Sequence, residues 1–518
     1  MAELISYNGV ATWSNDQVKL LVRHSNHSAL PTGNSWTCQQ NNANNAYNVT
    51  IPSGNVNNNN KNNTYSVVRV SELCELVEKL LDAEQCCFKN KKHKIDAAKF
   101  HYHLSKIYAL AADILTDRYK PQASICFALT YPKLREVFAA KYRDRVIHHY
   151  LAPFIMSVTE KVHTANGNIS HGNRPKLSAQ TAAEQLQEYM KAMPDGYVLT
   201  MDIKGFFMNL ERQMSYEIFE KFCKKITPQD YCKDERKSML QLLHTLLISD
   251  PAENCVINSP QEILSQIPPH KSLRYGSKKG LPIGNFYSQL IANLVSALWG
   301  MVIKKVPGVR VTQFVDDMAC VVPDAETANR VHELSAQTLT KIGLTLHPTK
   351  FYLQPVRHGA YFCGRVVFAD RIYIGNRCVR ACKRKICRFV NQGASVESAR
   401  KMLCSVNSYT GIMCHCQSFN LQKQLMYSVL DSGYNKYLYF EERKGHLVCK
   451  MFPMYKELNV HNTEIKNINN QLKIYKNEYK RNINSRSGDR TQACHYGTRY
   501  HRSLWLPADR RQRLRKVC

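Results

Sequence analysis

Two adjacent aspartates, Asp316 and Asp317, lie between two short apolar runs in the stretch VTQFVDDMACVV, residues 311–322. Apolar runs of this length are typical of β-strands, so the pair is predicted at the tip of a hairpin. Two like charges side by side repel unless a cation lies between them, and Mg²⁺ takes oxygen ligands while keeping part of its shell for substrate phosphates. The pair therefore indicates a two-metal phosphoryl-transfer site, although a solvated turn also accounts for the dipeptide taken alone.

A third carboxylate, Asp202, occurs in a similar setting in YVLTMDIKGFFMNL, residues 197–210. An apolar run delivers this aspartate at its C-terminal end, and Lys204, Gly205 and an aromatic pair follow at once. Two strands that each present an acid at their ends can meet edge to edge and form one metal site. Between the two acidic stretches, GLPIGNFYSQLIANL (280–294) is predicted to be a turn that leads into an apolar helix.

Five segments in chain order, and a sixth upstream of them, resemble the motifs of reverse transcriptases. Asp202, the GNFYSQ turn and FVDD resemble motifs A, B and C, and GLTLHPTKFYL (343–353) resembles motif D. AYFCGRVVF (360–368) is similar to the primer grip, and YPKLREVFAAKYRDRVIHHYLAP (131–153) is similar to the fingers motifs of one branch of the superfamily. The resemblance covers residues 90–450 and implies an α+β right-hand polymerase with an antiparallel palm sheet, helical fingers and a helical thumb.

The turn of motif B distinguishes branches of this superfamily. Intron, retron and retroviral enzymes generally have QGxxxSP there, whereas the residues from Ile283 to Gln289 match the IGNxxSQ form of reverse transcriptases from diversity-generating retroelements. That resemblance implies error-prone, adenine-mutagenic synthesis of complementary DNA from a template-repeat RNA, for diversification of a target gene by mutagenic retrohoming.

Two alternatives stay open beside that function. One is a group II intron, retron or phage-defence reverse transcriptase, against which stand Ile283, Gln289 and the lack of a recognisable endonuclease or maturase segment. The other is a non-catalytic RNA-binding protein of the same fold, against which stands the presence of all three carboxylates.

The resemblance also assigns roles to individual residues. Asp202, Asp316 and Asp317 are expected to be catalytic and to bind two Mg²⁺ ions, with Ile203 beside them in the metal site. The positions expected to bind the nucleotide are Arg135, Phe207, Ile283, Gly284, Gln289 and Lys350. The positions expected to contact nucleic acid are Lys133, Lys141 and Arg143. The residues alone also allow Phe207 to be a core aromatic, Lys350 a surface lysine and the basic residues a solvated face.

Composition and motifs together divide the chain into five parts. We expect an Asn-rich leader in 1–70, N-terminal helices and fingers in 71–195, a palm with motifs A to E in 196–370, a thumb in 371–450 and a basic tail in 451–518. A length of 518 residues suits two or three packed subdomains with appendages. The tail either binds nucleic acid or aids solubility.

The leader differs from the rest of the chain. More than half of the residues from Asn41 to Asn63 are asparagine, which is too polar to bury a core and predicts a poorly ordered segment. The stretch from Ser35 to Val70 also resembles the end of a lectin-fold variable protein, the segment that diversity-generating retroelements copy from an adenine-rich repeat. Asparagine codons are adenine-rich, so a translated template repeat is the second interpretation. On either one, the leader lies outside the polymerase fold.

The net charge points to a polyanionic partner. The chain has 71 Lys and Arg against 41 Asp and Glu, a net charge of +30, and phosphate neutralisation by such residues supplies most sequence-independent affinity for nucleic acid. The charge alone also suits a ribosomal or membrane-surface protein. The expected partners are template RNA, primer and complementary DNA, deoxynucleoside triphosphates and, from the family, a small basic helical accessory protein.

Neither secretion nor membrane insertion is indicated. The sequence has no unbroken run of 18 apolar residues and no N-terminal signal, so a cytoplasmic location without membrane contact is expected. The 19 cysteines are scattered and lack the paired CxxC spacing of a zinc site, so reduced thiols are expected.

Overall fold

The structure is a computed structural model that describes residues 37–41, 46–52, 65–89, 91–131, 133–226, 230–275 and 279–456. The chain separates into two compact units, residues 1–458 and residues 459–518. The second unit, and with it most of the predicted basic tail, lies outside the described residues.

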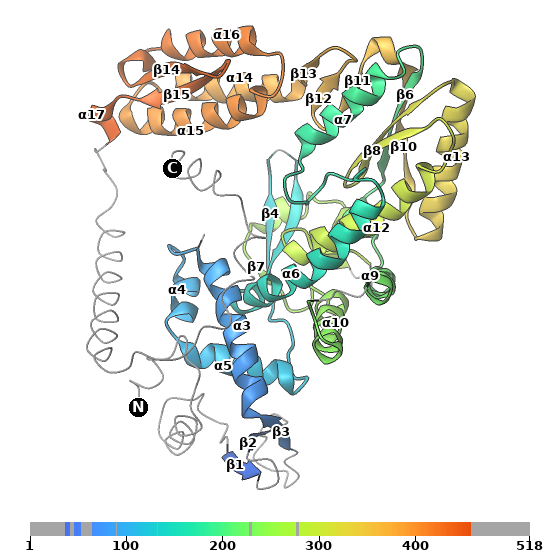
Figure 1. Ribbon diagram of the computed structural model, residues 1–518. Coiled ribbons are helices and arrows are strands. Elements are labelled where there is room, and N and C mark those ends of the chain that lie inside the picture. Colours follow the sequence, from blue (N-terminus) through green and yellow to red (C-terminus); the bar gives the residue numbers. More distant parts are fainter. Residues whose placement is uncertain are drawn as a thin grey trace, which may run out of the picture. The chain divides into compact units, whose positions relative to one another are not determined.

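Four strands form an antiparallel sheet in the order β10-β6-β9-β8 (Figure 1). Their bounds are β6 (Tyr197–Ile203), β8 (Arg310–Phe314), β9 (Asp317–Val322) and β10 (Leu346–Pro355). Most side chains of β6 and β9 are buried, because successive residues of a strand point to opposite faces and helices cover both faces here. The sheet, together with the helices around it, confirms the predicted α+β class.

Helix α7 (Ala179–Lys191) covers one face of this sheet, where it packs on alternate residues such as Val198. Helices α12 (Phe286–Ile303) and α13 (Ala325–Lys341) cover the other face, into which Leu199 points. Alternate side chains of the strand therefore pack against the apolar faces of the helices on either side of the sheet, which gives two apolar layers.

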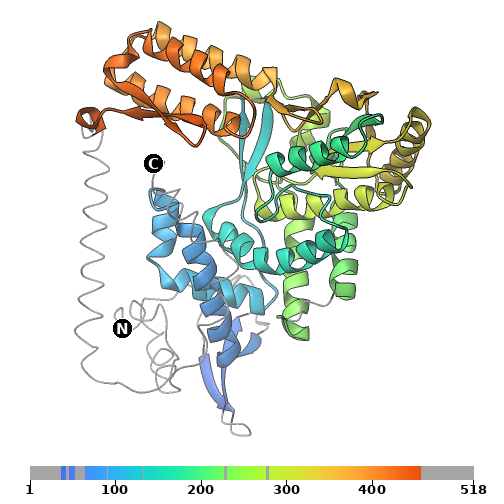
Figure 2. The ribbon, with the colours of Figure 1, turned by 45° about the horizontal axis from the view of Figure 1, so that its top comes forward.

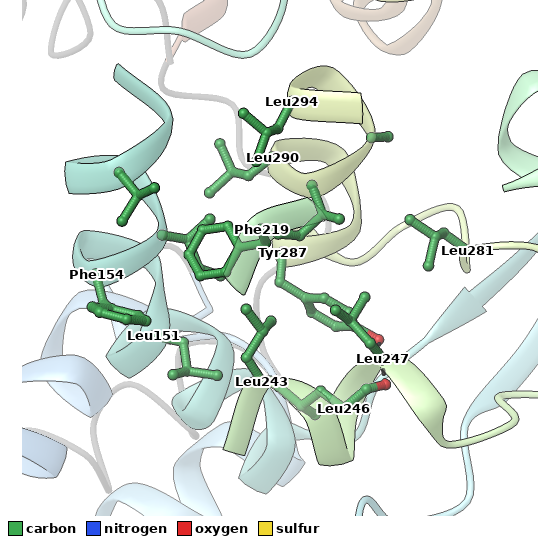
Figure 3. Close-up of a cluster of buried hydrophobic side chains, with 14 of the residues drawn as sticks. Leu151, Phe154, Phe219, Leu243, Leu246, Leu247, Leu281, Tyr287, Leu290 and Leu294 are labelled. Carbon is green, nitrogen blue, oxygen red and sulfur yellow. Dashed lines mark hydrogen bonds between the residues drawn. The ribbon is translucent and has the colours of Figure 1, made fainter. Parts of the chain in front are cut away.

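Helix α12 lies among α6 (Tyr142–Ala165), α9 (Arg212–Ile226) and α10 (Lys233–Ile248). Figure 3 shows this contact, where α12 meets the other three helices through the side chains of Leu151, Phe154, Phe219, Leu243, Leu246, Leu247, Tyr287, Leu290 and Leu294. Among the described helices, α12 alone is long and apolar enough to cross a membrane by length and composition, and 72% of it is buried inside the protein. Its apolar character is therefore accounted for by its place in the core.

Three helices precede this core. They are α3 (Val70–Phe88), α4 (Ile95–His101) and α5 (Leu104–Leu115). Helix α3 is amphipathic, and its buried face belongs to the same apolar core as α6 and α12.

A small three-stranded sheet has the order β5-β4-β7, with β4 (Ile125–Leu129), β5 (Arg135–Ala139) and β7 (Val256–Ile257). Short helices α11 (Gln261–Leu264), η1 (Pro269–Lys271) and η2 (Leu273–Tyr275) lie between β7 and α12 in the chain. The region predicted as helical fingers thus contains a sheet, because the continuous apolar run of β4 pairs with β5 and with the distant β7.

Residues 360–451 form two further layers. A small antiparallel sheet consists of β11 (Ala360–Phe362), β12 (Arg365–Val367) and β13 (Ile372–Ile374). Helices α14 (Asn376–Asn391), α15 (Val396–Met413) and α16 (Phe419–Leu430) then pack around a core of their own (orange in Figure 2).

The helical thumb expected for 371–450 needs a correction. Its last part is a hairpin of β14 (Leu438–Arg443) and β15 (His446–Met451), which packs on α15 and α16 before the short helix α17 (Pro453–Lys456). Leu447, Cys449 and Met451 are buried at period two, which is a strand pattern within a region that the helical resemblance had covered.

The leader also differs from the expectation that it is poorly ordered and without structure. Strands β1 (Thr37–Asn41), β2 (Ala46–Pro52) and β3 (Tyr65–Arg69) form an antiparallel sheet within it. The sequence AYNVTIP of β2 alternates apolar and polar residues, a strand signal that the surrounding asparagines obscure. The Asn-rich segments between these strands lie outside the described residues.

Candidate active site

The hairpin of β8 and β9 turns through two residues, Val315 and Asp316, since Phe314 and Asp317 pair as the last rung of the ladder. Val315 has φ = 59°, whereas Asp316 is not in the positive-φ region. A positive φ at the first turn residue alone is the pattern of a type II′ turn, in which glycine is preferred. A β-branched residue therefore holds a strained conformation directly before Asp316, as occurs at functional sites.

The third aspartate lies on the neighbouring strand. Asp202 of β6 is the register partner of Asp317 of β9, and the backbone N of Ile203 donates to the carbonyl O of Asp316 over 3.4 Å. The three predicted catalytic aspartates are thus brought together at one end of two adjacent strands. Ile203 has its side chain in the apolar core, so its carbonyl oxygen is the part of this residue that can face a cation.

Both hairpin aspartates have perturbed carboxyl groups. Burial raises the pKa of Asp316, and nearby Arg135 and Lys133 oppose that rise. Burial and the negative charge of Asp316 together raise the pKa of Asp317 to about 7. A cation at this position would relieve the repulsion that causes the second shift.

Three predicted basic residues lie close to these carboxylates. Arg135, the first residue of β5, exerts its charge on Asp316, and Lys133, two residues before it, on both hairpin aspartates. Lys350 of β10 forms an ion pair with Asp202 through its Nζ atom. Positive charge therefore surrounds the acidic site, and this is the setting that a triphosphate requires.

The carboxylates alone are not a closed metal cage. Among the residues that the structure describes, no group of three or more His, Cys, Asp or Glu side chains is arranged to hold a metal ion. Asp202 is engaged with Lys350 instead. Magnesium is commonly held by one or two carboxylates with water and substrate phosphates, so hard oxygen donors without a full cage fit that ion.

The turn before α12 is fastened to β5. The backbone N of Phe138 donates to the carbonyl O of Ile283 (3.1 Å), and the N of Ala140 donates to Oδ1 of Asn285 (3.4 Å). Gly284 has φ = 112°, and a Cβ atom there would lie 2.9 Å from Cγ1 of Val137. Gly284 is therefore required by both backbone and space, and the turn brings Ile283 to the strand that begins with Arg135.

Phe207 and Gln289 flank the same turn. Phe207 is half-buried beside the buried Phe206, with ring centroids 5.5 Å apart, and its carbonyl O accepts from the N of Leu281 (2.8 Å). Gln289 lies half-buried in the first turn of α12. Of the two aromatics after Asp202, Phe207 is the one with an exposed part.

Lys141 and Arg143 are not brought to the aspartates. The guanidinium of Arg143 pairs with Asp113 (2.7 Å) and lies over the ring of Tyr119, while Lys141 precedes α6 and acts on the buried Asp144. Arg143 is therefore engaged with α5, which precedes β4, and Lys141 with the first turn of α6.

Two contacts near the site were not predicted from the sequence, although the first involves a residue of the segment that resembles the primer grip. Cys363, in the turn between β11 and β12, is buried enough that its thiol pKa rises, with further contributions from Asp317 and Asp316. Residues 166–178 form a loop that packs against the hairpin through Ile169 and His171. Both contacts join segments distant in sequence, which local patterns do not reveal.

Comparisons with known proteins give structural neighbours only. No family model matches the sequence, and no curated protein matches it. Similar solved structures include telomerase from Candida albicans in complex with a fragment of telomeric RNA (12% identity, TM-score 0.37, 61% of each chain covered). Telomerase from Candida tropicalis is similar in a truncated form (11% identity, TM-score 0.37, 49% of this chain and 55% of that one) and in the apo form (10%, 0.39, 61% and 58%).

The matched region spans less than two thirds of each telomerase chain. With TM-scores below 0.4 and identities of 10–12%, these neighbours do not assign a function, which is argued from the residues of the site instead.

Proposed function

We propose that this protein is an RNA-directed DNA polymerase, a nucleotidyltransferase that works with two Mg²⁺ ions. The observation that carries the proposal is the meeting of Asp202 with Asp316 and Asp317 on adjacent antiparallel strands. The alternative for the pair alone is a solvated turn. A solvated turn does not account for Asp202, which is buried opposite Asp317.

The aspartates have the role of metal ligands in this proposal. Asp202 and Asp316 are the principal carboxylate ligands, and Asp317 is the most dispensable of the three. When bound, Mg²⁺ acidifies the primer 3′-hydroxyl and neutralises the triphosphate. The raised pKa of Asp317 supports a site that is electrostatically incomplete until a cation binds.

The surrounding residues bind and orient the substrates. Lys133 and Arg135 supply positive charge for the triphosphate or the template backbone, since Lys and Arg are the usual phosphate ligands. Lys350 exchanges its contact with Asp202 for the leaving pyrophosphate and protonates it. Phe207 packs under the sugar of the incoming nucleotide and leaves no room for a 2′-hydroxyl.

The elements divide as in a right hand under this proposal. The four-stranded sheet is the palm, the small sheet with β4 and β5 belongs to the fingers, and α14 to α16 are the thumb that holds the primer-template duplex. The template is RNA, the product is complementary DNA and the location is the cytoplasm. A net charge of +30 supports binding of these polyanions.

We further propose the diversity-generating type, in which the complementary DNA carries errors opposite template adenines. The support is Ile283, Gly284 and Gln289 in the turn before α12, together with the Asn-rich leader. The template is then an adenine-rich repeat, and a small basic helical protein assists the enzyme. An adenine-rich repeat in the neighbouring DNA, with a near-copy inside a lectin-like gene, would support this type.

Primer extension tests the proposed function. The full chain is incubated with an RNA template, an annealed DNA primer, deoxynucleoside triphosphates and Mg²⁺, with and without chelator. We expect RNA-templated extension that the chelator stops. Stable binding of the RNA without any extension, under Mg²⁺ or Mn²⁺, would overturn the proposal in favour of a non-catalytic RNA-binding protein.

A further inference from the structure

The loop at 166–178, between α6 and α7, covers the open edge of the central sheet. Strand β8 is the edge strand, and Gln313 in it makes two backbone hydrogen bonds to this loop. Its N donates to the carbonyl O of Ile169 (2.8 Å), and its O accepts from the N of His171 (2.9 Å). These bonds add a parallel rung to the sheet directly behind the hairpin turn.

The side chain of Gln313 bridges a helix and the turn. It is fully buried, and its Nε2 atom donates both to the carbonyl O of Ser296 in α12 and to the carbonyl O of Val315, each over 3.0 Å. A Cβ atom on Gly300 would lie 2.9 Å from its Oε1 atom, so a glycine in α12 makes room for the amide. The amide therefore holds the backbone of Val315 against the rigid central helix.

The other side of Val315 is in contact with Gly172. A Cβ atom at Gly172 would lie 2.3 Å from Cγ2 of Val315, which real side chains do not tolerate. Gly172 is itself held, because its carbonyl O accepts from Nδ2 of Asn293 (2.8 Å). The Oδ1 atom of the same asparagine accepts from Oγ of Ser170 (2.9 Å). Val315 is thus enclosed between a buried amide and a fixed loop.

We propose that Gln313 is a positioning residue for the candidate catalytic site. Its amide keeps Val315 in the left-handed region, and this fixes the direction in which the next residue, Asp316, presents its carboxylate. A β-branched residue does not stay at φ = 59° unless its surroundings hold it there. Metal ligands must be held within narrow limits by the residues behind them. This inference rests on the proposed function of the aspartates.

The first test is the substitution Gln313→Met, which keeps the length of the side chain and removes both hydrogen bonds. Primer extension is measured as a function of Mg²⁺ concentration. We expect the half-saturating Mg²⁺ concentration to rise about tenfold, since loss of a buried hydrogen-bond donor is of that size. A merely structural role would lower the thermal stability and leave the Mg²⁺ requirement of the folded enzyme unchanged.

A double-mutant cycle with Val315→Gly gives the decisive measurement. Glycine takes a positive φ without strain, so it does not need to be held by the amide. In the Val315→Gly background, Gln313→Met should therefore raise the Mg²⁺ requirement less than about threefold. Equal effects of Gln313→Met in both backgrounds would overturn the positioning role. Thr312→Val, at a fully buried neighbour on the same strand, is the control and should leave the Mg²⁺ requirement unchanged.

A second pair of variants covers the case in which Gln313→Met does not fold. Gly172→Ala presses on Cγ2 of Val315 from the loop side and should also raise the Mg²⁺ requirement. Val315→Gly removes Cγ2 and should restore it, and failure of that restoration counts against the proposal. A wild-type chain that extends no primer overturns the proposed function instead. An active wild type with an unchanged Mg²⁺ requirement in both Gln313→Met and Gly172→Ala overturns only the positioning role.

Discussion

Asp202 and Asp316 are the residues on which the proposed chemistry depends most directly, and each is expected to be essential. Replacement of either by Asn removes one charged oxygen ligand and should lower DNA synthesis by at least about 100-fold. RNA binding should change less than about twofold, because one residue alters little of a +30 chain. Primer extension and filter binding measure the two effects. Asp324→Asn is the matched control, since Asp324 caps α13 at the surface and Asn caps helices equally well.

Ile283 permits a test of fidelity. Its counterpart in the QG form of the turn is a glutamine, which by resemblance hydrogen-bonds around the sugar of the incoming nucleotide, and isoleucine has no such group. A polar contact contributes on the order of 1 kcal/mol, so Ile283→Gln should lower errors opposite adenine by about fivefold to tenfold. The missing bond gives no physical reason why adenine, rather than any base, is misread.

Sequencing of complementary DNA made on one RNA template by both proteins measures the change. Ile283→Met is the control, because methionine fills similar space without a hydrogen bond and should leave the error spectrum as it is. An unchanged adenine error rate in Ile283→Gln would remove this residue from the mechanism.

The aspartates and Arg143 show how far residue types and spacing reach. The position of the three aspartates at the ends of apolar runs predicted that they lie close together, because the ends of neighbouring strands in one sheet are close in space. The environment of Arg143 was not predictable, since its partner Asp113 lies thirty residues away in another helix. The left-handed conformation of Val315 was not predictable either, because FVDD lacks the glycine that would indicate such a turn.

At the scale of elements, long periodic segments were predicted and short non-local pairings were not. Helix α13 and strand β6 follow apolar periods that a single segment displays. The hairpin β14–β15 is a local pairing, which the resemblance to a helical thumb obscured. The edge contact of residues 166–178 with Gln313 and the pairing of β4 with β7 depend on partners far away in the chain. Register and pairing of that kind are tertiary properties, which local composition does not contain.

Helix α6 carries a buried histidine whose titration should govern acid stability. Burial lowers the pKa of His148 to about 3, and its ring packs edge-on against Tyr287 at 4.7 Å. The folded chain therefore stays unprotonated at His148 while the unfolded chain binds a proton below pH 6.5. The stabilisation is complete above that pH and is lost as the pH falls toward 3.

The substitution His148→Phe keeps the ring and removes the titration. Between pH 7 and pH 5 the wild type should lose about 2 kcal/mol of unfolding free energy from this residue, and the variant should lose that much less. Urea unfolding at the two pH values measures the difference. His163 of the same helix, whose pKa is also lowered to about 3, remains in both proteins and supplies the residual acid sensitivity. Identical pH slopes would show that His148 is protonated or exposed in the folded chain.

At the scale of the whole molecule, the described chain has two main apolar cores. One unites α3, α6, α12 and the central sheet, and the other is confined to α14, α15, α16 and their hairpin. The candidate catalytic aspartates lie next to residues of the first core on β6 and β9, whereas the helices of the second core carry exposed basic residues such as Arg384 and Arg388 on α14. Under the proposed function, substitutions of these basic residues on α14 should lower the affinity for the primer-template duplex before they change the Mg²⁺ requirement.

The N-terminal leader is expected to be dispensable for polymerisation. Deletion of residues 1–65 removes β1 and β2 but keeps Val68, which is buried in the core with Leu73 at the start of α3. Primer extension by this variant should stay within about twofold of the full chain, because the removed strands pair with one another and with β3 at the margin of that core. Deletion of residues 1–69 also removes Val68 and should cost about 1.5–3 kcal/mol of unfolding free energy. Unfolding or inactivation of the shorter deletion would show instead that the sheet of the leader supports the polymerase core.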